Sequence, residues 1–172
     1  TIKAIYVKNS YSIDFVTNGG DTIESQTYPY HDLLNLPSAT GKLGYLFAGW
    51  YEDINLTIKF NDINMPATNL TLYAKWTINS YLITFFNASN SVISTQSVDY
   101  QSDISSLAVN PPSILGYDFI GWDLEIPESM PAGNLEFRPV YQPKKYNLIY
   151  QNPDESIVYM SEIEYGTSLE NI

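Results

Sequence analysis

The 172-residue sequence contains no cysteine. Disulfide bonds, zinc–thiolate sites and cysteine nucleophiles are therefore excluded together. Small secreted domains of animals usually carry disulfides, so their absence favours a bacterial or a cytosolic origin.

Basic residues are also scarce. The chain has 8 Lys plus Arg against 19 Asp plus Glu, and its formal net charge is −11. Without a basic stripe that could neutralise phosphates, nucleic acid and anionic membranes are poor partners. No apolar run approaches the ~18–20 residues of a membrane-spanning helix. We therefore predict no nucleic-acid partner and no direct insertion into a membrane.

Apolar and aromatic residues, in contrast, are plentiful. They make up 44% and 15% of the chain, which is far from the composition of a disordered protein. Each aromatic ring can bury roughly 150–250 Å². This composition suits small domains, which need a large buried area per residue.

An internal repeat organises the chain. Residues 44–50 read Gly-Tyr-Leu-Phe-Ala-Gly-Trp, and residues 116–122 read Gly-Tyr-Asp-Phe-Ile-Gly-Trp. Each segment is followed by Met-Pro-Ala, which begins at Met65 and at Met130. Two copies of such a pattern indicate tandem structural units.

The front half of the unit occurs three times. It begins at Tyr11, Tyr81 and Tyr146, and a second tyrosine follows each of them 19 residues later, namely Tyr30, Tyr100 and Tyr165. This spacing predicts that the chain is part of a longer array. We expect four parts: the last strand of a preceding repeat (1–9), repeat 1 (10–79), repeat 2 (80–144) and the first half of repeat 3 (145–172).

Within one repeat, the pattern is mainly that of strands. Residues 11–17 alternate between apolar and polar side chains, which is typical of a strand with one buried face. Residues 18–21, Asn-Gly-Gly-Asp, predict a hairpin turn before a returning strand at 22–30. Repeat 2 has Asn-Ala-Ser-Asn at 87–90 instead, for which we expect a looser hairpin.

The second half of the repeat combines further strands with a predicted helix. Asp32 could cap one or two helical turns that carry Leu33, Leu34 and Leu36, and residues 102–107 have a similar pattern. Strands are expected at 45–51 and 70–76, with a bulge or a close backbone contact at Gly49. The expected fold class is α+β, with a small mixed sheet and one short helix in each repeat.

These motifs resemble the Listeria–Bacteroides repeat, also known as the internalin B-repeat. Repeat 1 carries nearly the whole pattern: Tyr11, Phe15, Asn-Gly-Gly at 18–20, Tyr30, Gly-Tyr at 44–45, Phe47, Gly-Trp at 49–50, and 69–76. The resemblance implies a β-grasp (ubiquitin-like) fold and tandem arrays on large secreted or wall-anchored bacterial proteins. It also implies roles in adhesion or as spacers, without shared catalytic or ligand-binding residues.

No catalytic residue is predicted. The single histidine, His31, could act as a general base, but Gln101 and Gly166 occupy the matching positions of the other copies. A surface or capping role fits this variation better. Without a nucleophile and an orienting group beside the histidine, no catalytic triad can form.

No metal or cofactor site is predicted either. The acidic residues Glu52, Asp53, Asp62, Asp154 and Glu155 could suggest calcium. They lack the alternating Asp-x-Asp-x-Asp-Gly spacing of a calcium loop. A solvated acidic surface is the simpler interpretation.

The tryptophans have two possible roles. Trp50, Trp76 and Trp122 could form a platform that stacks on sugars. Trp50 and Trp122 occupy the same position in successive repeats, which favours the core, whereas Trp76 ends its strand beside a linker. Lys75 could form an isopeptide crosslink, but Pro139 replaces it in repeat 2.

The sequence thus favours a non-catalytic repeat region of a bacterial protein that is extracellular, on the cell surface or in the cell wall. The expected role is that of an extended spacer or stalk in adhesion. The alternative is a binding module. Its repeats would contact a host-surface protein, a glycan or another repeat, the last through a sheet edge.

Overall fold

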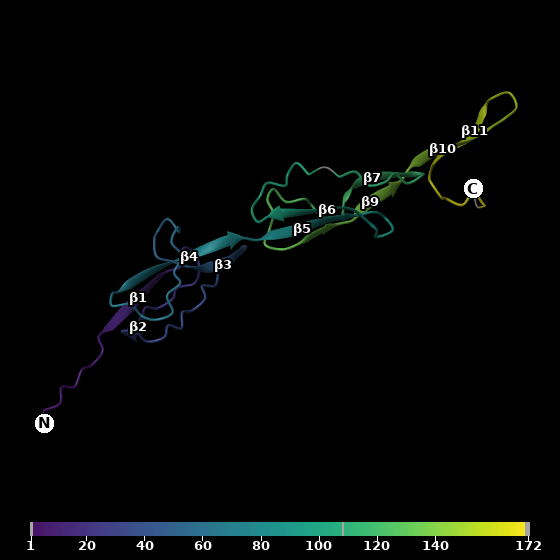
Figure 1. Ribbon diagram of the computed structural model, residues 1–172. Helices are drawn as coiled ribbons and strands as arrows, with labels where there is room; N and C mark the ends of the chain where they lie inside the picture. The colour runs from purple at the N-terminus through teal and green to yellow at the C-terminus, as the bar shows by residue number, and fades with distance from the viewer. Residues whose placement is uncertain (1, 108, 171–172) are drawn as a thin grey trace. The chain divides into compact units, whose positions relative to one another are not determined.

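A computed structural model of the chain describes residues 2–107 and 109–170. The chain divides into two compact units, residues 1–79 and 80–172, and each is described by itself. Figure 1 shows that both units are built from strands and long connecting loops. The predicted four-part division into repeats remains a prediction.

The first unit contains one mixed sheet of four strands in the order β2-β1-β4-β3. β1 lies in the middle, antiparallel to β2 and parallel to β4, and β3 is antiparallel to β4. The first and last strands of the repeat are therefore neighbours. The strand bounds are β1 Ser10–Val16, β2 Gln26–Pro29, β3 Tyr45–Tyr51 and β4 Leu70–Ile78.

The second unit repeats these pairings in separate ladders. β5 (Ser80–Phe86) pairs antiparallel with β6 (Val92–Asp99) and parallel with β8 (Leu135–Phe137). β7 (Tyr117–Trp122) pairs antiparallel with β9 (Pro139–Pro143). Because Pro139 has no amide hydrogen, the strand that corresponds to β4 is interrupted between β8 and β9.

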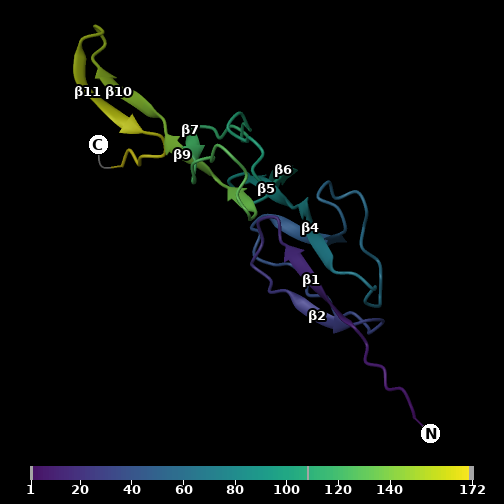
Figure 2. The ribbon, with the colours of Figure 1, turned by 90° about the vertical axis from the view of Figure 1, so that its left-hand side faces the viewer.

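A hairpin follows in the second unit. β10 (Lys145–Gln151) and β11 (Ile157–Glu164) pair antiparallel, and Figures 1 and 2 show them side by side. Their sequence corresponds to the first two strands of a repeat.

The predicted α+β, ubiquitin-like fold with one short helix per repeat is wrong, because the described parts of the chain contain strands and turns but no helix. In the segment expected to be helical, backbone amides form hydrogen bonds with a distant loop. The amide of His31 donates to Met65 O, and that of Leu34 donates to Ile63 O, both at 2.9 Å. These bonds replace the contacts that a helical turn would make within itself.

The second unit makes the same bonds. The amide of Gln101 donates to Met130 O, and that of Ile104 donates to Glu128 O, again at 2.9 Å. In addition, His31 and Gln101 have φ angles of 68° and 64°, which lie outside the helical range. The leucine-rich segment is therefore a turn that is tied to the loop before Met65.

Each unit has its own core on one face of its strands. Trp50 is only 5% exposed, which confirms its predicted place in the core, and Trp122 packs against the second core. The buried residues correspond between repeats: Ile13 with Ile83, Met65 with Met130, and Leu72 with Phe137.

A chain of aromatic contacts recurs with almost unchanged distances. Trp50 lies 4.8 Å from Phe15 and 5.2 Å from Phe47, measured between ring centroids. Trp122 lies 4.8 Å from Phe85 and 5.3 Å from Phe119. The Gly-Tyr-x-Phe-x-Gly-Trp segment therefore has the same packing in both repeats.

The predicted irregularity at Gly49 is confirmed. The register of β3 against β4 shifts between Phe47 and Gly49, and Gly49 has a φ of 123°. β7 shifts in the same way at Gly121, whose φ is 142°. These β-bulges place Phe47 and Trp50 on the core side of the strand.

The expectation of a looser hairpin in repeat 2 is wrong. The β5–β6 pairing extends from Ser80↔Asp99 to Phe86↔Val92, beyond the range of β1–β2. The Asn87 carboxamide oxygen accepts hydrogen bonds from the amides of Ser89 and Ser91, at 3.0 and 2.9 Å. This side chain closes the turn without glycine.

Candidate functional site

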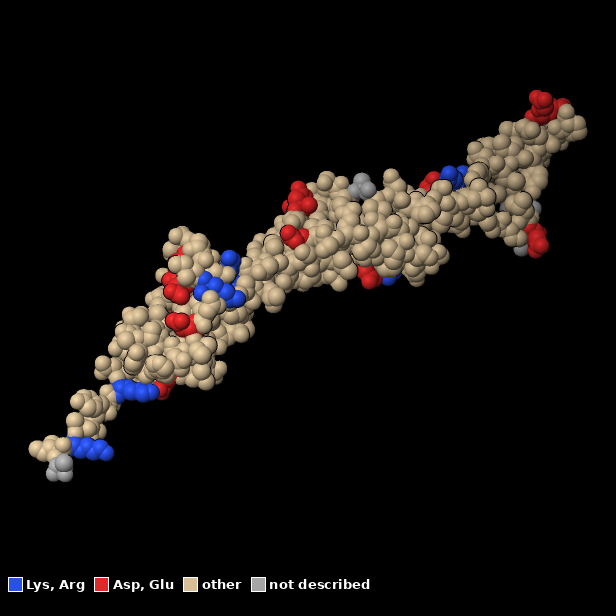
Figure 3. Space-filling view, viewed as in Figure 1, with Lys and Arg blue, Asp and Glu red and all other residues tan. Residues whose placement is uncertain are grey.

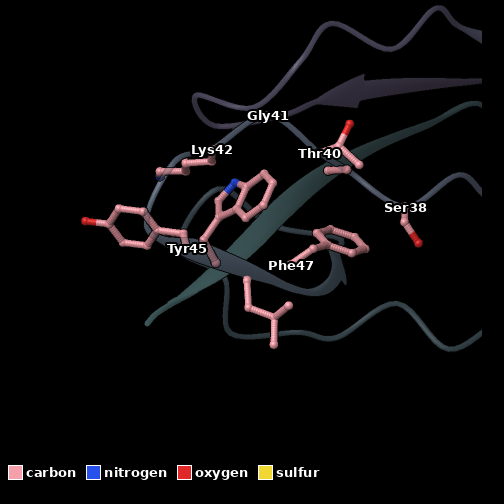
Figure 4. Close-up of a pocket in the computed structure, with 9 residues that line it drawn as sticks. Ser38, Thr40, Gly41, Lys42, Tyr45 and Phe47 are labelled. Atoms are coloured by element: carbon pink, nitrogen blue, oxygen red, sulfur yellow. The ribbon is translucent and has the colours of Figure 1, made fainter. Parts of the chain in front are cut away.

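The first unit has a surface hollow of about 420 Å³. Figure 4 shows that it lies between the loop at 38–42 and the side chains of β3 and β4. Most of its surface is apolar. Its lining includes Thr40, Gly41, Lys42, Tyr45, Phe47 and Trp76.

The loop at 38–42 is held close to the hairpin turn of the same repeat. The amide of Asp21 donates to Thr40 O at 2.7 Å, and the Thr40 hydroxyl donates to the Asp21 carboxylate at 2.9 Å. A Cβ on Gly20 would lie 2.6 Å from both Thr40 O and the Trp76 ring. The absence of a side chain at Gly20 therefore allows the turn, the loop and the indole to meet.

Lys42 and Trp76 give the hollow its chemical character. The Lys42 ammonium lies 4.7 Å from the Tyr45 ring centroid and 5.7 Å from that of Trp76. It donates to Asn18 O at 2.9 Å, while the Trp76 indole N–H donates to Thr17 O at 2.9 Å. The hollow thus offers ring faces beside one cation, a surface suited to stacking rather than to proton transfer.

The second repeat does not reproduce this surface. Ile114 stands in the place of Lys42, and Tyr141 in the place of Trp76. The Tyr141 hydroxyl donates to Pro112 O at 2.6 Å and thereby ties down the loop that corresponds to 38–42. The combination of a lysine with a tryptophan at this surface is therefore specific to repeat 1.

His31 lies in a turn and not in a reactive cluster. Its ring meets that of Tyr30 edge-on, with 5.7 Å between the centroids. The Asn64 carboxamide nitrogen donates to His31 O at 3.1 Å. His31, Gln101 and Gly166 all have positive φ angles of 68°, 64° and 84°, so the common feature of this position is its backbone conformation.

This conformation predicts a stabilising substitution. Glycine adopts a positive φ without the steric cost that a Cβ causes. We expect His31→Gly to raise the free energy of unfolding of the first unit by about 0.5–1 kcal/mol, because the relieved strain exceeds the entropy that glycine adds to the unfolded chain. Urea unfolding measures this difference. Gln101→Gly is the matched variant in the second unit, and a loss of stability in both variants would contradict the explanation.

Two of the five acidic candidates for calcium, Asp53 and Asp154, hold turns together through hydrogen bonds. The Asp53 carboxylate accepts hydrogen bonds from the amides of Ile58 and Thr57, at 2.7 and 2.9 Å, and from the Thr57 hydroxyl at 2.8 Å. Asp154 accepts from the amide and the hydroxyl of Ser156, at 3.1 and 2.6 Å. Across the described residues, no group of three or more His, Asp or Glu side chains is arranged to hold a metal ion.

The hydrogen bonds to Asp53 predict a pH effect. The Ile58 amide contributes most to lowering the pKa of Asp53 and the Thr57 hydroxyl and amide add to this, while partial desolvation opposes them. A carboxylate with a lowered pKa stabilises the fold above its unfolded pKa of about 3.9, and this contribution disappears as the pH falls through the folded value. We expect the stability difference between the parent and Asp53→Asn to be largest near neutral pH and to shrink below about pH 4. Urea unfolding at several pH values measures it, and a difference that stays constant would contradict this assignment.

The structure also shows the contacts of two remaining candidates, Lys75 and Trp76. The Lys75 ammonium lies 4.7 Å from the Tyr51 ring centroid and donates to Leu56 O at 3.3 Å, which holds it over the loop after β3. Trp76 is partly buried and packs against the first core. The expectation that it ends its strand is wrong, because β4 continues to Ile78. The hollow beside Trp76 could not be predicted, because the loop at 38–42 has an ordinary polar composition.

Charge is distributed without a continuous basic area on the face shown in Figure 3. Acidic side chains are scattered, and basic side chains lie singly or in small groups. Among the residues that the structure describes, no helix is long and apolar enough to cross a membrane.

Each unit, considered on its own, consists of strands with an aromatic core on one face. The two units therefore define a tandem-repeat protein. The chain belongs to the Listeria-Bacteroides repeat domain family, whose model matches residues 11–75 and 81–126. The predicted resemblance is confirmed.

Three curated relatives share this sequence pattern. A protein of Evansella cellulosilytica named "Putative membrane protein" is 29% identical over 180 residues, and a "Putative Gly-rich membrane protein" of the same organism is 34% identical over 123 residues. Internalin H of Listeria monocytogenes is 38% identical over 115 residues. The matches cover 98%, 71% and 66% of this chain but only 26%, 14% and 20% of the relatives.

Proposed function

We propose that this chain is a non-catalytic spacer region of a bacterial cell-envelope protein, located at the cell surface or in the cell wall. Its repeats would hold another part of the protein at a distance from the envelope. The names of the relatives support the location, since two are named "Putative membrane protein" and "Putative Gly-rich membrane protein" and the third is an internalin.

One observation carries this proposal: several core positions hold the same residue in both repeats, whereas the residues around the hollow differ. Ile13, Phe15, Trp50 and Met65 have the identical residues Ile83, Phe85, Trp122 and Met130 as counterparts. At the hollow, Leu46, Lys42 and Trp76 are replaced by Asp118, Ile114 and Tyr141. A spacer needs each module to fold but needs no particular surface, whereas a multivalent binder needs the same face in every copy.

The excess of acidic residues fits the same role. A net charge of −11 keeps a chain with so many aromatic residues soluble and discourages adhesion to anionic envelope polymers. This repulsion between like charges does not depend on any single residue.

Surface display tests the spacer function. The chain is placed between a membrane anchor and a terminal peptide tag on a bacterial cell, and binding of an antibody to the tag is measured. We expect accessibility to rise when the chain is duplicated and to fall when it is deleted. The triple variant Lys42→Ile, Leu46→Asp, Trp76→Tyr, which gives repeat 1 the residues of repeat 2, should leave accessibility unchanged. Accessibility that is independent of chain length would overturn the proposal.

The hollow supports a second candidate function, namely binding of a glycan or of a host-surface protein by repeat 1. The observation in its favour is the partly exposed Trp76 ring beside Lys42. Titration with soluble cell-surface glycans, followed by tryptophan fluorescence, tests it. A saturable change that disappears in the triple variant would favour binding, and self-association through a sheet edge would instead appear as a particle mass that rises with concentration in small-angle X-ray scattering.

A further inference from the structure

A single residue connects the end of repeat 2 to the hairpin that follows it. β9 ends at Pro143 and β10 begins at Lys145, so Lys144 alone lies between them. The Lys144 amide donates to Gly116 O at 2.8 Å, and the Tyr165 amide donates to Lys144 O at 2.8 Å. Both backbone polar groups of Lys144 are therefore bonded, one toward repeat 2 and the other toward the hairpin.

The Tyr165 ring lies directly on Gly116. A Cβ on Gly116 would lie 2.3–2.4 Å from three carbons of this ring, so the ring occupies the place of a side chain. Gly116 is buried and has a φ of 78°, a conformation that favours glycine. The Tyr117 ring meets Tyr165 edge-on, with 5.7 Å between the centroids. The hairpin thus contacts repeat 2 through a ring that only a glycine can accommodate.

The backbone bonds at Lys144 have counterparts inside the first unit. The Asn79 amide donates to Gly44 O at 2.9 Å, as Lys144 does to Gly116. The Tyr30 amide donates to Asn9 O at 2.7 Å, as Tyr165 does to Lys144. Since other copies of the repeat make each of these bonds, the arrangement belongs to the repeat and not to the hairpin alone.

We propose that the edge formed by Gly116 and Tyr117 is a docking surface for the start of the next repeat, and that Tyr165 is the positioning residue that fixes its orientation. The occupant is the β10–β11 hairpin of the same chain. A connection of one residue could rotate about its backbone dihedral angles, but the two hydrogen bonds and the ring contact hold it in one conformation. This inference rests on the proposed spacer function for its biological purpose, since a spacer of defined direction needs fixed connections.

Distance measurements between two spin labels test the proposal. The chain contains no cysteine, so Thr95→Cys on β6 and Val158→Cys on β11 provide two exposed labelling sites that make none of the contacts above. Double electron–electron resonance then reports the distribution of distances between repeat 2 and the hairpin. We expect one narrow peak for the labelled parent chain.

Four substitutions separate the ring contact from other effects. Gly116→Ala, which leaves the hairpin itself untouched, should abolish the narrow peak. Gly166→Ala is the matched control: its φ of 84° is similar, but no atom lies within 4 Å of the added Cβ, so the peak should remain. Tyr165→Ala should also abolish the peak, whereas Tyr165→Phe should preserve it, because the contact uses the ring and not the hydroxyl.

Several outcomes would overturn the proposal. A broad distribution in the parent chain would show that the connection is not fixed, and a narrow peak in both Gly116→Ala and Tyr165→Ala would show that the ring does not fix it. Equal broadening in Gly116→Ala and Gly166→Ala would assign the effect to backbone strain alone. Failure of the spacer function would be seen separately, as tag accessibility that does not depend on the length of the displayed chain.

Discussion

Replacing Trp50 with alanine is expected to lower the free energy of unfolding of the first unit by about 3–5 kcal/mol. The indole is 5% exposed, packs on Phe15 and Phe47, and donates from its N–H to Pro37 O at 2.8 Å. A single core of this size contributes only about 3–5 kcal/mol in total. The variant should therefore be largely unfolded in residues 10–79 at room temperature. Urea unfolding followed by NMR signals of β1 and β4 measures the change.

Two control variants show which part of the indole matters. Trp50→Phe keeps a ring in the core but leaves Pro37 O without its donor, for which we expect a cost of about 1–3 kcal/mol. Leu46→Ala removes a side chain that is 65% exposed on the same strand and should change stability by less than about 0.5 kcal/mol. A Trp50→Ala variant that is as stable as Leu46→Ala would show that the indole does not hold the core together.

Phe85→Ala should have an effect of similar size in the second unit, again about 3–5 kcal/mol. Phe85 is fully buried, and its ring lies 5.1 Å from Phe137 and 4.8 Å from Trp122. Because β5 pairs with both β6 and β8, loss of this ring removes contacts on which two strand pairings depend. Hydrogen exchange of the β5 amides measures the loss of protection.

Leu82→Ala is the matched control for Phe85. It lies on the same strand and is 44% exposed, so its removal should leave most of the protection of β5 intact. Equal loss in both variants would mean that strand propensity and not the aromatic core determines the stability of this unit.

The strands could be predicted from the sequence because their information is local. The alternation from Tyr11 to Val16 reflects one buried and one exposed face, and the small residue Gly49 between bulky neighbours indicates a bulge. Trp50 and Trp122 occupy the same position in successive repeats, and this repetition predicted their place at the core.

The absence of a helix at residues 32–36 could not be predicted in this way. Leu33, Leu34 and Leu36 have a spacing that suits a helix, but the amide of Leu34 is bonded to Ile63 O, a residue of a distant loop. Such pairing between distant segments overrides local propensity. A helical turn and the observed turn differ in the partners of their backbone hydrogen bonds. The sequence of residues 31–36 does not say which partners are used.

The candidate site was only partly predictable for a related reason. Trp76 was expected to belong less to the core than Trp50 because it was expected to end its strand. Although β4 continues to Ile78, the Trp76 ring is indeed less buried. The hollow beside it needs Gly20, which allows the loop at 38–42 to approach the turn. The 19-residue step from the first tyrosine of each copy to Tyr30, Tyr100 and Tyr165 was visible in the sequence. The contact of Tyr165 with Gly116, however, depends on the one-residue connection at Lys144.

The parallel pairing of β1 with β4 has a mechanical consequence. β1 begins at Ser10 and β4 ends at Ile78, so in a parallel pair the two ends of the repeat lie at opposite ends of one ladder. Tension applied to these ends acts along the strands and loads their hydrogen bonds in shear, so that they must break together and not one after another. The Asn69 carboxamide, which accepts from the Ser12 amide at 2.9 Å, adds a side-chain bond to this ladder, and Asn134 does the same for Leu82. The repeat is therefore arranged to resist stretching between its two ends.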